Sequence, residues 1–230
     1  GKYRNLNIRG IHLHIGSQIV HNKPFLKAVK IALLLKHEKG CDFEYLNIGG
    51  GLGIIYKDEK AITADEYSKE IKSLVQKENL KLILEPGRFI VGNSGILVLA
   101  VQYLKKGLEK TFAVVDGGMN LLIRPALYSA YHEIVPVKKS GAKKCSYDIV
   151  GPVCESSDFL GLSRSLPSLK EGDKIAVLSA GAYGFTMASN YNSQPRCGEV
   201  LVRGRNAYLI REAEDYNDLI RNERRPGFLR

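Results

Sequence analysis

The sequence predicts two domains of different class: the late units of an eight-unit, TIM-type β/α barrel over residues 1–94, then a mostly antiparallel, β-barrel-like domain over residues 95–230. Strand-like runs end near residues 15, 48 and 84, and a helical pattern lies between each pair. An unusual polar or glycine-rich stretch follows each of these strands, which is where β/α barrels carry function. After about residue 94, short β-rich runs punctuated by Gly, Pro, Asn and Ser replace the helices.

Periodicity and helix-boundary residues define the elements of the first domain. Apolar residues alternate with two histidines over residues 11–15, which is strand periodicity. The first helix has a proline near its start and Gly40 as a stop. The run Thr63-Ala64-Asp65-Glu66 is a capping box that opens the second helix. The expected elements are strands ending near 15, 48 and 84 and helices over 24–39 and 63–79.

The second domain is expected to consist of short strands and a charged tail that forms a short helix from about Glu212. The densest basic run, residues 138–144, is typical of a solvated turn. A complete eight-unit barrel of roughly 250 residues needs about five more units upstream. Because the chain also begins with Gly1 rather than Met, we expect it to be the later part of a longer protein. The expected strands cover 96–104, 111–116, 133–137, 147–150, 174–179 and 199–210.

The composition excludes some classes of partner. Hydrophobic residues make up 44% and charged residues 25% of the 230, as in an ordinary globular protein. The formal charge of +10 suggests nucleic-acid binding, but the first forty residues hold most of it, and Glu38 is their one acidic residue. No basic helix interleaved with aromatic residues is present, so we expect no nucleic-acid partner. No apolar run is long enough to span a bilayer, so we expect no membrane association.

The cysteines and histidines do not form a metal-binding pattern. The four cysteines lie far apart without a CxxC pair, which disfavours disulfides and structural zinc and indicates a reducing, cytoplasmic location. The pair His12-x-His14 is typical of some metal hydrolases, which need further ligands after later strands. None of the other histidines follows a suitable strand, so we expect no metal. The residues concerned are Cys41, Cys145, Cys154, Cys197, His21, His37 and His132.

Two strand-end motifs suit a phosphate-bearing ligand. Three consecutive glycines, Gly49-Gly50-Gly51, allow backbone N–H groups to approach a phosphate closely, although a loop that turns a corner has the same composition. Glu85-Pro86-Gly87-Arg88 places an acid and a base in one tight turn. This turn is either a surface ion pair, or a carboxylate for a cationic ring nitrogen beside a guanidinium for an anion.

Two further motifs lie in the second domain. Cys154, Glu155 and Asp158 are three ionisable residues within five positions, after a Gly-Pro turn. A cysteine there is either inert or a proton donor, because a perturbed thiol titrates near working pH. Tyr183 is a glycine-flanked phenol directly after an apolar strand, which suits a hydroxyl held toward an anion.

Six motifs occur together and in order, and together they resemble one family. They are HIGSQ, GGGLG, EPGR, RPALY, GPVCESSD and GAYGFTMASNYNSQPR. This run closely resembles the diaminopimelate decarboxylases, the fold type III, pyridoxal-phosphate-dependent enzymes that make L-lysine from meso-diaminopimelate. The resemblance covers nearly all of residues 7–210.

The resemblance implies that pyridoxal 5'-phosphate is the cofactor. His14 would stack on one face of the pyridine ring. Glu85 would pair with the protonated ring nitrogen, which keeps the ring an electron sink. His12 is expected to be structural. The residues implied to hold the cofactor phosphate are Ser17, Gly49, Gly50, Gly51, Pro86, Gly87, Arg88 and Tyr183.

The resemblance also implies a substrate site and a homodimer. Besides the ring-stacking His14, Cys154 would be catalytic, as the proton donor to the carbanion left after CO₂ departs. Glu155 would bind the distal amino-acid end of the substrate. Both Cys154 and Glu155 act across a homodimer interface in the family. The residues implied to bind substrate are Arg88, Arg124, Tyr128, Glu155 and Tyr183.

The chain departs from the family at Pro195-Arg196-Cys197-Gly198, where Pro-Arg-Pro-Ala is usual, and, with greater consequence, at the cofactor anchor. The lysine that anchors the cofactor covalently lies on an early barrel strand, in a Tyr-Ala-x-Lys-Ala-Asn-like motif that is absent here, and Lys2 is no substitute. We therefore expect this chain alone to lack the anchor and to be inactive.

Two alternatives remain. One is a sibling decarboxylase of ornithine, arginine or carboxynorspermidine, although Glu155 after the cysteine and the RPALY run favour diaminopimelate. The other is a non-catalytic paralogue, against which the retention of His14, Glu85, Cys154 and Tyr183 argues.

Overall fold

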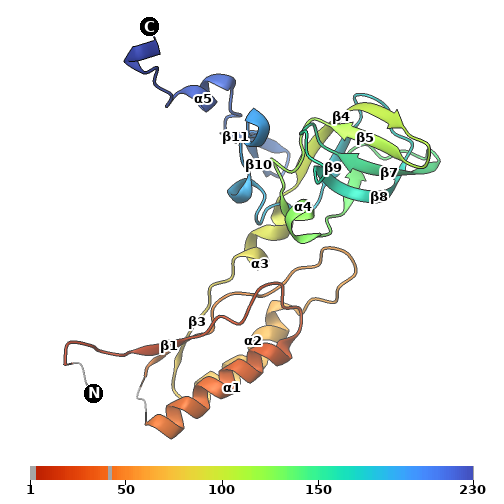
Figure 1. The fold of residues 1–230 in the computed structure, drawn as a ribbon. Coiled ribbons are helices and arrows are strands. Elements are labelled where there is room, and N and C mark those ends of the chain that lie inside the picture. Colours follow the sequence, from red (N-terminus) through yellow and green to blue (C-terminus); the bar gives the residue numbers. More distant parts are fainter. Residues whose placement is uncertain (1–3, 41–42, 230) are drawn as a thin grey trace. The chain divides into compact units, whose positions relative to one another are not determined.

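Contacts along the chain divide it into two units, Gly1–Ser94 and Gly95–Arg230, in a computed structural model that describes residues 4–40 and 43–229 (Figure 1). Lys2 and Cys41, named above, lie outside the described residues. Within the described ranges, no helix has both the length and the apolar character needed to cross a membrane.

The first unit is a three-stranded parallel sheet whose strands are joined by two helices (Figure 1). The strands lie in chain order, and Ile11, Leu46 and Leu82 are neighbours across the sheet. This β-α-β-α-β order is what the alternating strand and helix patterns predict. The elements are β1 (Gly10–His12), α1 (Asn22–Lys39), β2 (Tyr45–Asn47), α2 (Ala64–Lys77) and β3 (Lys81–Ile83).

The helix boundaries follow the local signals closely. Helix α1 begins at Asn22, two residues before the expected start, and ends where Gly40 adopts the left-handed conformation at φ 56°. The capping box at α2 is confirmed, because the Thr63 hydroxyl accepts from the Glu66 N–H at 3.2 Å and the Glu66 carboxylate accepts from the Thr63 N–H at 2.8 Å.

Both helices pack with β2 in one apolar core. Phe25 of α1 and Tyr67 of α2 meet edge to face, with ring centroids 4.8 Å apart. Burial raises the pKa of the Tyr67 phenol to about 12. Leu46 and Ile71 are fully buried beside them. This core therefore holds the two helices against the sheet. The loops that follow the strands extend from their carboxyl ends.

Strands β2 and β3 end at Asn47 and Ile83, within one residue of the predicted ends, but β1 ends at His12, three residues before its predicted end. Pairing between β1 and β2 stops at His12, although the Leu13 N–H still donates to the Asn47 carbonyl at 2.8 Å. Alternation of apolar and polar residues continues past the point where the chain leaves the sheet, so periodicity alone overestimates the strand. His14 consequently lies on a loop and not on the strand. Two unexpected short helices follow β3, namely α3 (Arg88–Val91) and the 3₁₀ turn η1 (Gly92–Ser94).

The second unit is built on a six-stranded sheet in the order β6-β9-β4-β5-β7-β8. The sheet is mixed, because β5 and β7 pair in parallel while the other neighbours are antiparallel. The edge strands β6 and β8 also contact each other, so the sheet is nearly closed. The strands are β4 (Leu97–Lys106), β5 (Thr111–Val115), β6 (Ile134–Pro136), β7 (Lys144–Val150), β8 (Phe159–Pro167) and β9 (Lys174–Val177).

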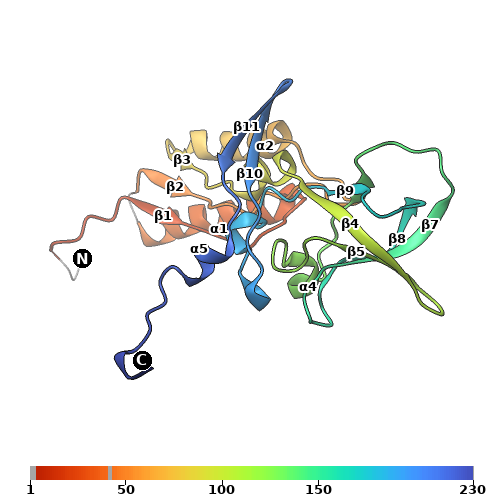
Figure 2. The same cartoon turned by 90° about the horizontal axis from the view of Figure 1, so that it is seen from above.

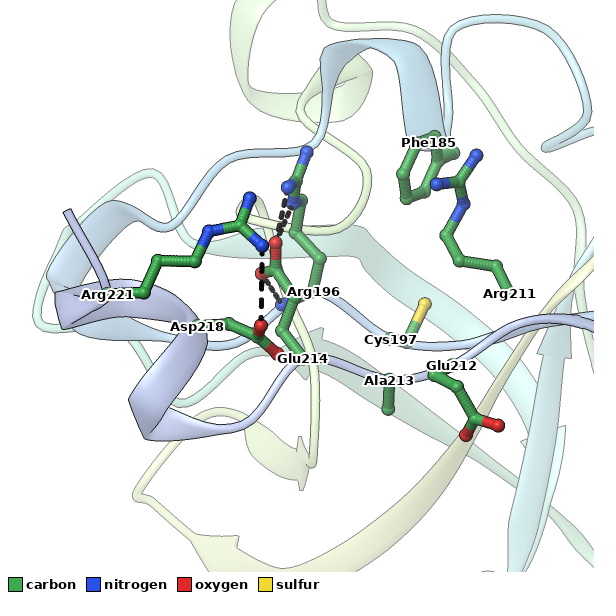
Figure 3. Close-up of a pocket in the computed structure, with 9 residues that line it drawn as sticks. All are labelled: Phe185, Arg196, Cys197, Arg211, Glu212, Ala213, Glu214, Asp218 and Arg221. Atoms are coloured by element: carbon green, nitrogen blue, oxygen red, sulfur yellow. Dashed lines mark hydrogen bonds and ion pairs between the residues drawn. The ribbon is translucent and has the colours of Figure 1, made fainter.

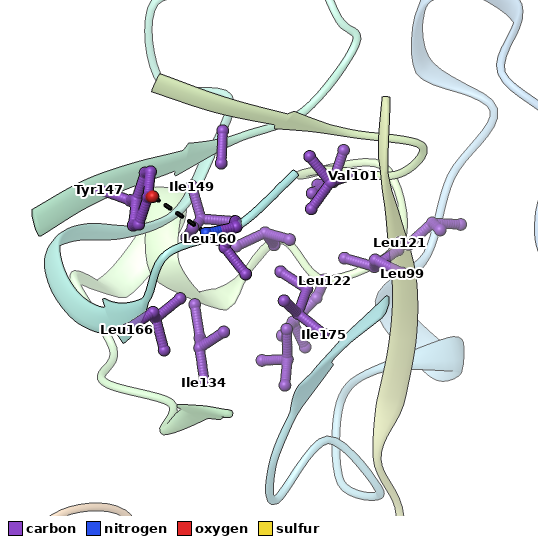
Figure 4. Close-up of a cluster of buried hydrophobic side chains, with 14 residues drawn as sticks. Leu99, Val101, Leu121, Leu122, Ile134, Tyr147, Ile149, Leu160, Leu166 and Ile175 are labelled. Atoms are coloured by element: carbon purple, nitrogen blue, oxygen red, sulfur yellow. Dashed lines mark hydrogen bonds between the residues drawn. The ribbon is translucent and has the colours of Figure 1, made fainter. Parts of the chain in front are cut away.

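The inside of this sheet holds the second apolar core (Figure 4). Val101, Ile149, Leu160 and Ile175 are almost completely buried there. The Tyr147 hydroxyl, also in this core, accepts a hydrogen bond from the Leu169 N–H at 3.1 Å. Strand β8 contributes to this core although the sequence does not predict it as a strand.

The rest of the second unit consists of short helices and one hairpin. The run 199–210, expected as one strand, is a hairpin (Figure 2). It turns at Gly204, and every residue of its second strand is exposed. The tail forms a short helix as expected, and the basic run from Lys138 to Lys144 is exposed throughout. These elements are α4 (Arg124–Tyr128), η2 (Phe185–Met187), η3 (Tyr191–Ser193), β10 (Glu199–Arg203), β11 (Asn206–Arg211), α5 (Tyr216–Ile220) and η4 (Gly227–Leu229).

Candidate active site

Three loops meet at the carboxyl ends of the parallel strands in the first unit. The Ile48 N–H donates to the Ile83 carbonyl at 3.1 Å, and the Glu85 N–H donates to the Gly49 carbonyl at 2.9 Å. The Ile19 N–H donates to the Gly51 carbonyl at 2.9 Å. The loop after β2 is therefore bound by backbone hydrogen bonds to the loops on both sides. We call this meeting point of loops 13–19, 48–54 and 84–88 the strand-end cluster.

The glycine run allows these loops to approach one another. Gly49 has φ 68°, and a Cβ atom there would lie 2.5 Å from the Leu13 carbonyl oxygen and 2.9 Å from Nδ1 of His14. A Cβ at Gly50 would overlap the Glu85 carbonyl oxygen, and one at Gly51 would overlap the Gly16 carbonyl oxygen. A side chain at any of these positions would displace a neighbouring loop, so the three glycines are what let the loops pack this closely.

His14 lies against this glycine run. Its Nδ1 is 3.4 Å from the Gly50 nitrogen, and its side chain is exposed. The imidazole therefore lies at the edge of the glycine loop, and its exposed faces are accessible to a ligand.

Glu85 is oriented by Asn47 and lies beside His12, and neither of these two was predicted as a site residue. The Asn47 amide donates to the Glu85 carboxylate at 2.6 Å, while its oxygen accepts from the Gly49 N–H at 2.8 Å. On the other side, Nε2 of His12 lies 3.7 Å from a Glu85 carboxylate oxygen. His12 is the last residue of β1, and Asn47 is the last residue of β2. A search of the sequence for polar residues at strand ends would therefore have identified both.

Arg88 connects the loops after β3 and β1. It is the first residue of α3, and Pro86 and Gly87 form the turn before it. Its guanidinium donates to the Ser17 hydroxyl at 3.0 Å and to the Tyr56 hydroxyl at 2.8 Å. A guanidinium and a hydroxyl held together in this way can bind one anion jointly.

In the second unit, Arg124 and Tyr183 lie together. Arg124 is 7% exposed at the start of α4, and its guanidinium lies 5.9 Å from the centroid of the Tyr183 ring. Tyr183 adopts a left-handed backbone with φ 60°, which is uncommon for a bulky residue and is found at functional turns. Tyr128 is exposed at the other end of α4.

Cys154 and Glu155 occupy an exposed loop that is fixed by a buried aspartate. The Asp158 carboxylate, 5% exposed, accepts from the N–H groups of Met119 and Val153, each at 2.7 Å. Hydrogen bonds from the backbone and then the hydroxyl of Ser157 lower the pKa of the Glu155 carboxyl. Glu155 is therefore an ionised, exposed acceptor beside an exposed thiol.

A cavity of about 280 Å³ lies elsewhere in the second unit, under the tail (Figure 3). The Phe185 ring contacts two guanidinium groups there, at 4.1 Å for Arg211 and 5.4 Å for Arg196. Two arginines of the cavity form ion pairs with carboxylates of the chain: Arg211 with Glu199, and Arg196 with Glu214. Its charges are thus balanced within the chain, and we assign it no ligand. It is lined by Phe185, Arg196, Cys197, Arg211, Glu212, Ala213, Glu214, Asp218 and Arg221.

Metal-ligating side chains are dispersed. Among residues 4–40 and 43–229, no three His, Cys, Asp or Glu side chains come together as a metal site. Cys145, Cys154 and Cys197 are free thiols.

A glycine-lined strand-end cluster with an oriented carboxylate and an arginine–serine pair defines a β/α site for a phosphate-bearing ligand. The pattern of the pyridoxal-dependent decarboxylases, C-terminal sheet domain, matches residues 22–181, and the chain belongs to this family.

Individual relatives are consistent with the family. The chain is 49% identical over 223 residues to the diaminopimelate decarboxylase of Aquifex aeolicus, covering 95% of this chain and 53% of that protein. It is similar to the crystal structure of the diaminopimelate decarboxylase from m. jannaschi, with a TM-score of 0.92 at 38% identity, over 97% of this chain and 53% of that one. It is also similar to the Helicobacter pylori diaminopimelate decarboxylase complexed with L-lysine, with a TM-score of 0.84 at 41% identity, over 93% of this chain and 54% of that one. The chain spans about half the length of these relatives.

Proposed function

We propose that this chain is the C-terminal part of a cytoplasmic enzyme that uses pyridoxal 5'-phosphate to decarboxylate meso-2,6-diaminopimelate to L-lysine and CO₂. One observation carries the proposal. The first three of the six ordered motifs converge on a single glycine-lined cluster, in a chain whose relatives are named diaminopimelate decarboxylase. We further propose that β1 to β3 are the late strands of a (β/α)₈ barrel and that the second unit is a mostly antiparallel, barrel-like domain in the full-length protein.

The cluster fits the cofactor, because the Arg88 guanidinium and the Ser17 hydroxyl lie 3.0 Å apart beside the glycine loop, and these donors suit a phosphate. When bound, pyridoxal phosphate supplies a cationic ring that delocalises the electron pair left on the α-carbon as CO₂ departs. The glycine amides and the Ser17 hydroxyl would hold its phosphate, with the Pro86–Arg88 turn and Tyr183 as further contacts. These residues fix the ligand so that the reacting bond keeps one orientation.

Two side chains of the cluster would act on the ring. The exposed His14 imidazole would cover one face and exclude water from it. Glu85, fixed through Asn47, would face the ring nitrogen and hold a proton there. A carboxylate that is already oriented needs no rearrangement when charge develops, which is how preorganised groups lower barriers.

The substrate's two ends require different groups. Arg88, Arg124, Tyr128 and Tyr183 suit its carboxylates, since guanidinium and phenol groups bind carboxylate oxygens directly. Glu155 stays ionised and can accept hydrogen bonds from the distal ammonium group.

The Cys154 thiol would deliver the proton that replaces CO₂ at the α-carbon. We propose that Cys154 and Glu155 reach the site across a homodimer interface, in agreement with their exposure on one loop.

The full-length protein tests the substrate. We expect CO₂ release from meso-diaminopimelate, little or none from ornithine, and L-lysine as product. The Cys154→Ala variant should turn over at least about 100-fold more slowly with unchanged cofactor absorbance. Decarboxylation of ornithine or arginine alone would assign the protein to a sibling enzyme. Absence of any turnover with cofactor bound would indicate a non-catalytic paralogue.

A further inference from the structure

His132 is a buried titratable residue to which the proposed chemistry gives no role. It follows α4 in the chain, and its side chain is completely buried. Its Nε2 atom lies 2.8 Å from Nη1 of Arg124, and its Nδ1 atom lies 2.9 Å from the carbonyl oxygen of Leu178. The imidazole therefore bridges an arginine and a backbone carbonyl.

The two contacts determine the protonation state of the ring. A guanidinium carries only donors, so Nε2 of His132 must accept from Arg124 and carries no proton. The Leu178 carbonyl only accepts, so Nδ1 must donate and carries the proton. His132 is thus the neutral Nδ1–H tautomer. A second proton would remove the acceptor and set two cations against each other inside the protein.

The bridge connects Arg124 to the backbone at the end of strand β9. Leu178 directly follows β9, and its N–H donates to the Glu133 carbonyl at 2.8 Å. The imidazole therefore bonds to the backbone after β9 through Nδ1 and to the Arg124 guanidinium through Nε2. Tyr183, on the same loop five residues after Leu178, lies under the Arg124 guanidinium.

We propose that His132 is a positioning residue of the substrate site: a neutral imidazole that aims the Arg124 guanidinium at an anionic group of the substrate. The inference rests on the proposed function for the identity of that anion, a carboxylate. The hydrogen bond to His132 fixes one edge of the planar guanidinium, and so fixes the direction in which its remaining donors point.

Two variants in the full-length enzyme with cofactor bound separate the two ends of the bridge. In His132→Asn the amide can still donate to the Leu178 carbonyl from a place close to Nδ1, but it cannot reach Arg124. In His132→Gln the amide oxygen can accept from Arg124 at a place close to Nε2. We expect His132→Asn to raise the Kd for L-lysine and the KM for meso-diaminopimelate about 10- to 100-fold, with a smaller change in kcat. We expect His132→Gln to recover most of the affinity.

The matched control is Tyr147→Phe, which removes a different buried hydrogen bond of the same unit. It should lower the unfolding temperature without changing either constant. Equal losses in His132→Asn and His132→Gln that follow the unfolding temperature would mean that His132 only packs. Unchanged constants in His132→Asn would also overturn the proposal.

A readout independent of turnover is the ¹⁵N spectrum of histidine-labelled full-length protein, in which the His132 resonances are those missing from His132→Gln. We expect one protonated and one unprotonated ring nitrogen near neutral pH. Two protonated nitrogens would contradict the proposal. If the wild-type enzyme neither binds L-lysine nor decarboxylates the substrate, the proposed function fails, while this spectrum still decides the state of His132.

Discussion

The strand-end cluster of the first unit is built from backbone, whereas the Arg124 and Cys154 regions of the second unit are built from side chains. In the first unit, loops approach so closely that Cβ atoms at Gly49 and Gly50 would meet carbonyl oxygens. In the second unit, His132 holds Arg124, and Asp158 holds the loop that carries Cys154. The glycine loops of the first unit leave no space for an added Cβ atom. The Arg124 and Cys154 regions of the second unit depend instead on the hydrogen-bonding groups of single side chains.

The largest effect is expected from adding a methyl group to the backbone-built cluster. Gly50→Ala places a Cβ against the Glu85 carbonyl, so the loops must separate. We expect the free energy of unfolding to fall by about 3 kcal/mol and cofactor binding to be lost, as measured by urea unfolding and by absorbance titration of the full-length protein. Gly141→Ala is the control, because a Cβ there has no heavy atom within 4 Å. Equal behaviour of the two variants would show that the cluster is not closely packed.

The side-chain counterpart is Asp158→Asn. An amide has one acceptor oxygen for two backbone N–H groups, so either Met119 or Val153 loses its partner. We expect a loss of about 2 kcal/mol in the free energy of unfolding, measured by chemical denaturation. Asp173→Asn is the control, because that carboxylate accepts from Lys170 in an exposed turn, and a loss below about 1 kcal/mol is expected there. A loss as large in the control would argue against a special role of Asp158.

Asn47 sharpens the comparison, since it is a side chain inside the backbone-built cluster. It bonds both the Glu85 carboxylate and the Gly49 N–H. In a double-mutant cycle of Asn47→Ala and Glu85→Gln, we expect a coupling of about 1 kcal/mol in cofactor binding. Additive effects would mean that Asn47 supports the glycine loop without orienting Glu85.

The smallest effect concerns the tail of the second unit. Hydrogen bonds from the Arg196 side chain and backbone lower the pKa of Glu214 to about 2. An unfolded glutamate titrates at about 4.3, so the pair contributes stability above that pH and loses it as the pH falls toward about 2. We expect Glu214→Gln to reduce the loss of unfolding free energy over this pH range by less than about 1 kcal/mol. The measurement is urea unfolding at a series of acid pH values. An acid dependence equal to that of the wild type would contradict the assignment.

Local signals predicted much of the first unit. The Thr63 capping box and the Gly40 stop are short-range patterns whose physics acts within one turn, and both hold. Because parallel strands share one carboxyl edge, strand spacing alone also indicated that the segments around His14, Gly49 and Glu85 would meet. Strand length was less accurate, since alternation does not reveal where pairing stops.

The second unit was less predictable because its order is non-local. The pairing of β5 with β7 in parallel, and the place of β9 between β4 and β6, depend on contacts far apart in the sequence. Strand β8 was not predicted from the sequence. Its pairing with β7 contains register shifts, and Ser163 within it has a positive φ, so its apolar residues do not alternate regularly. His132 has no motif of its own, and only the folded contacts with Arg124 and Leu178 reveal its tautomer.

The most direct test of the account is a crystal structure of the full-length protein with pyridoxal phosphate and L-lysine bound. The account predicts a phosphate within hydrogen-bond distance of the Gly50 or Gly51 amide and of the Ser17 hydroxyl, with the ring nitrogen facing Glu85. A cofactor whose phosphate is bound away from this cluster would contradict it.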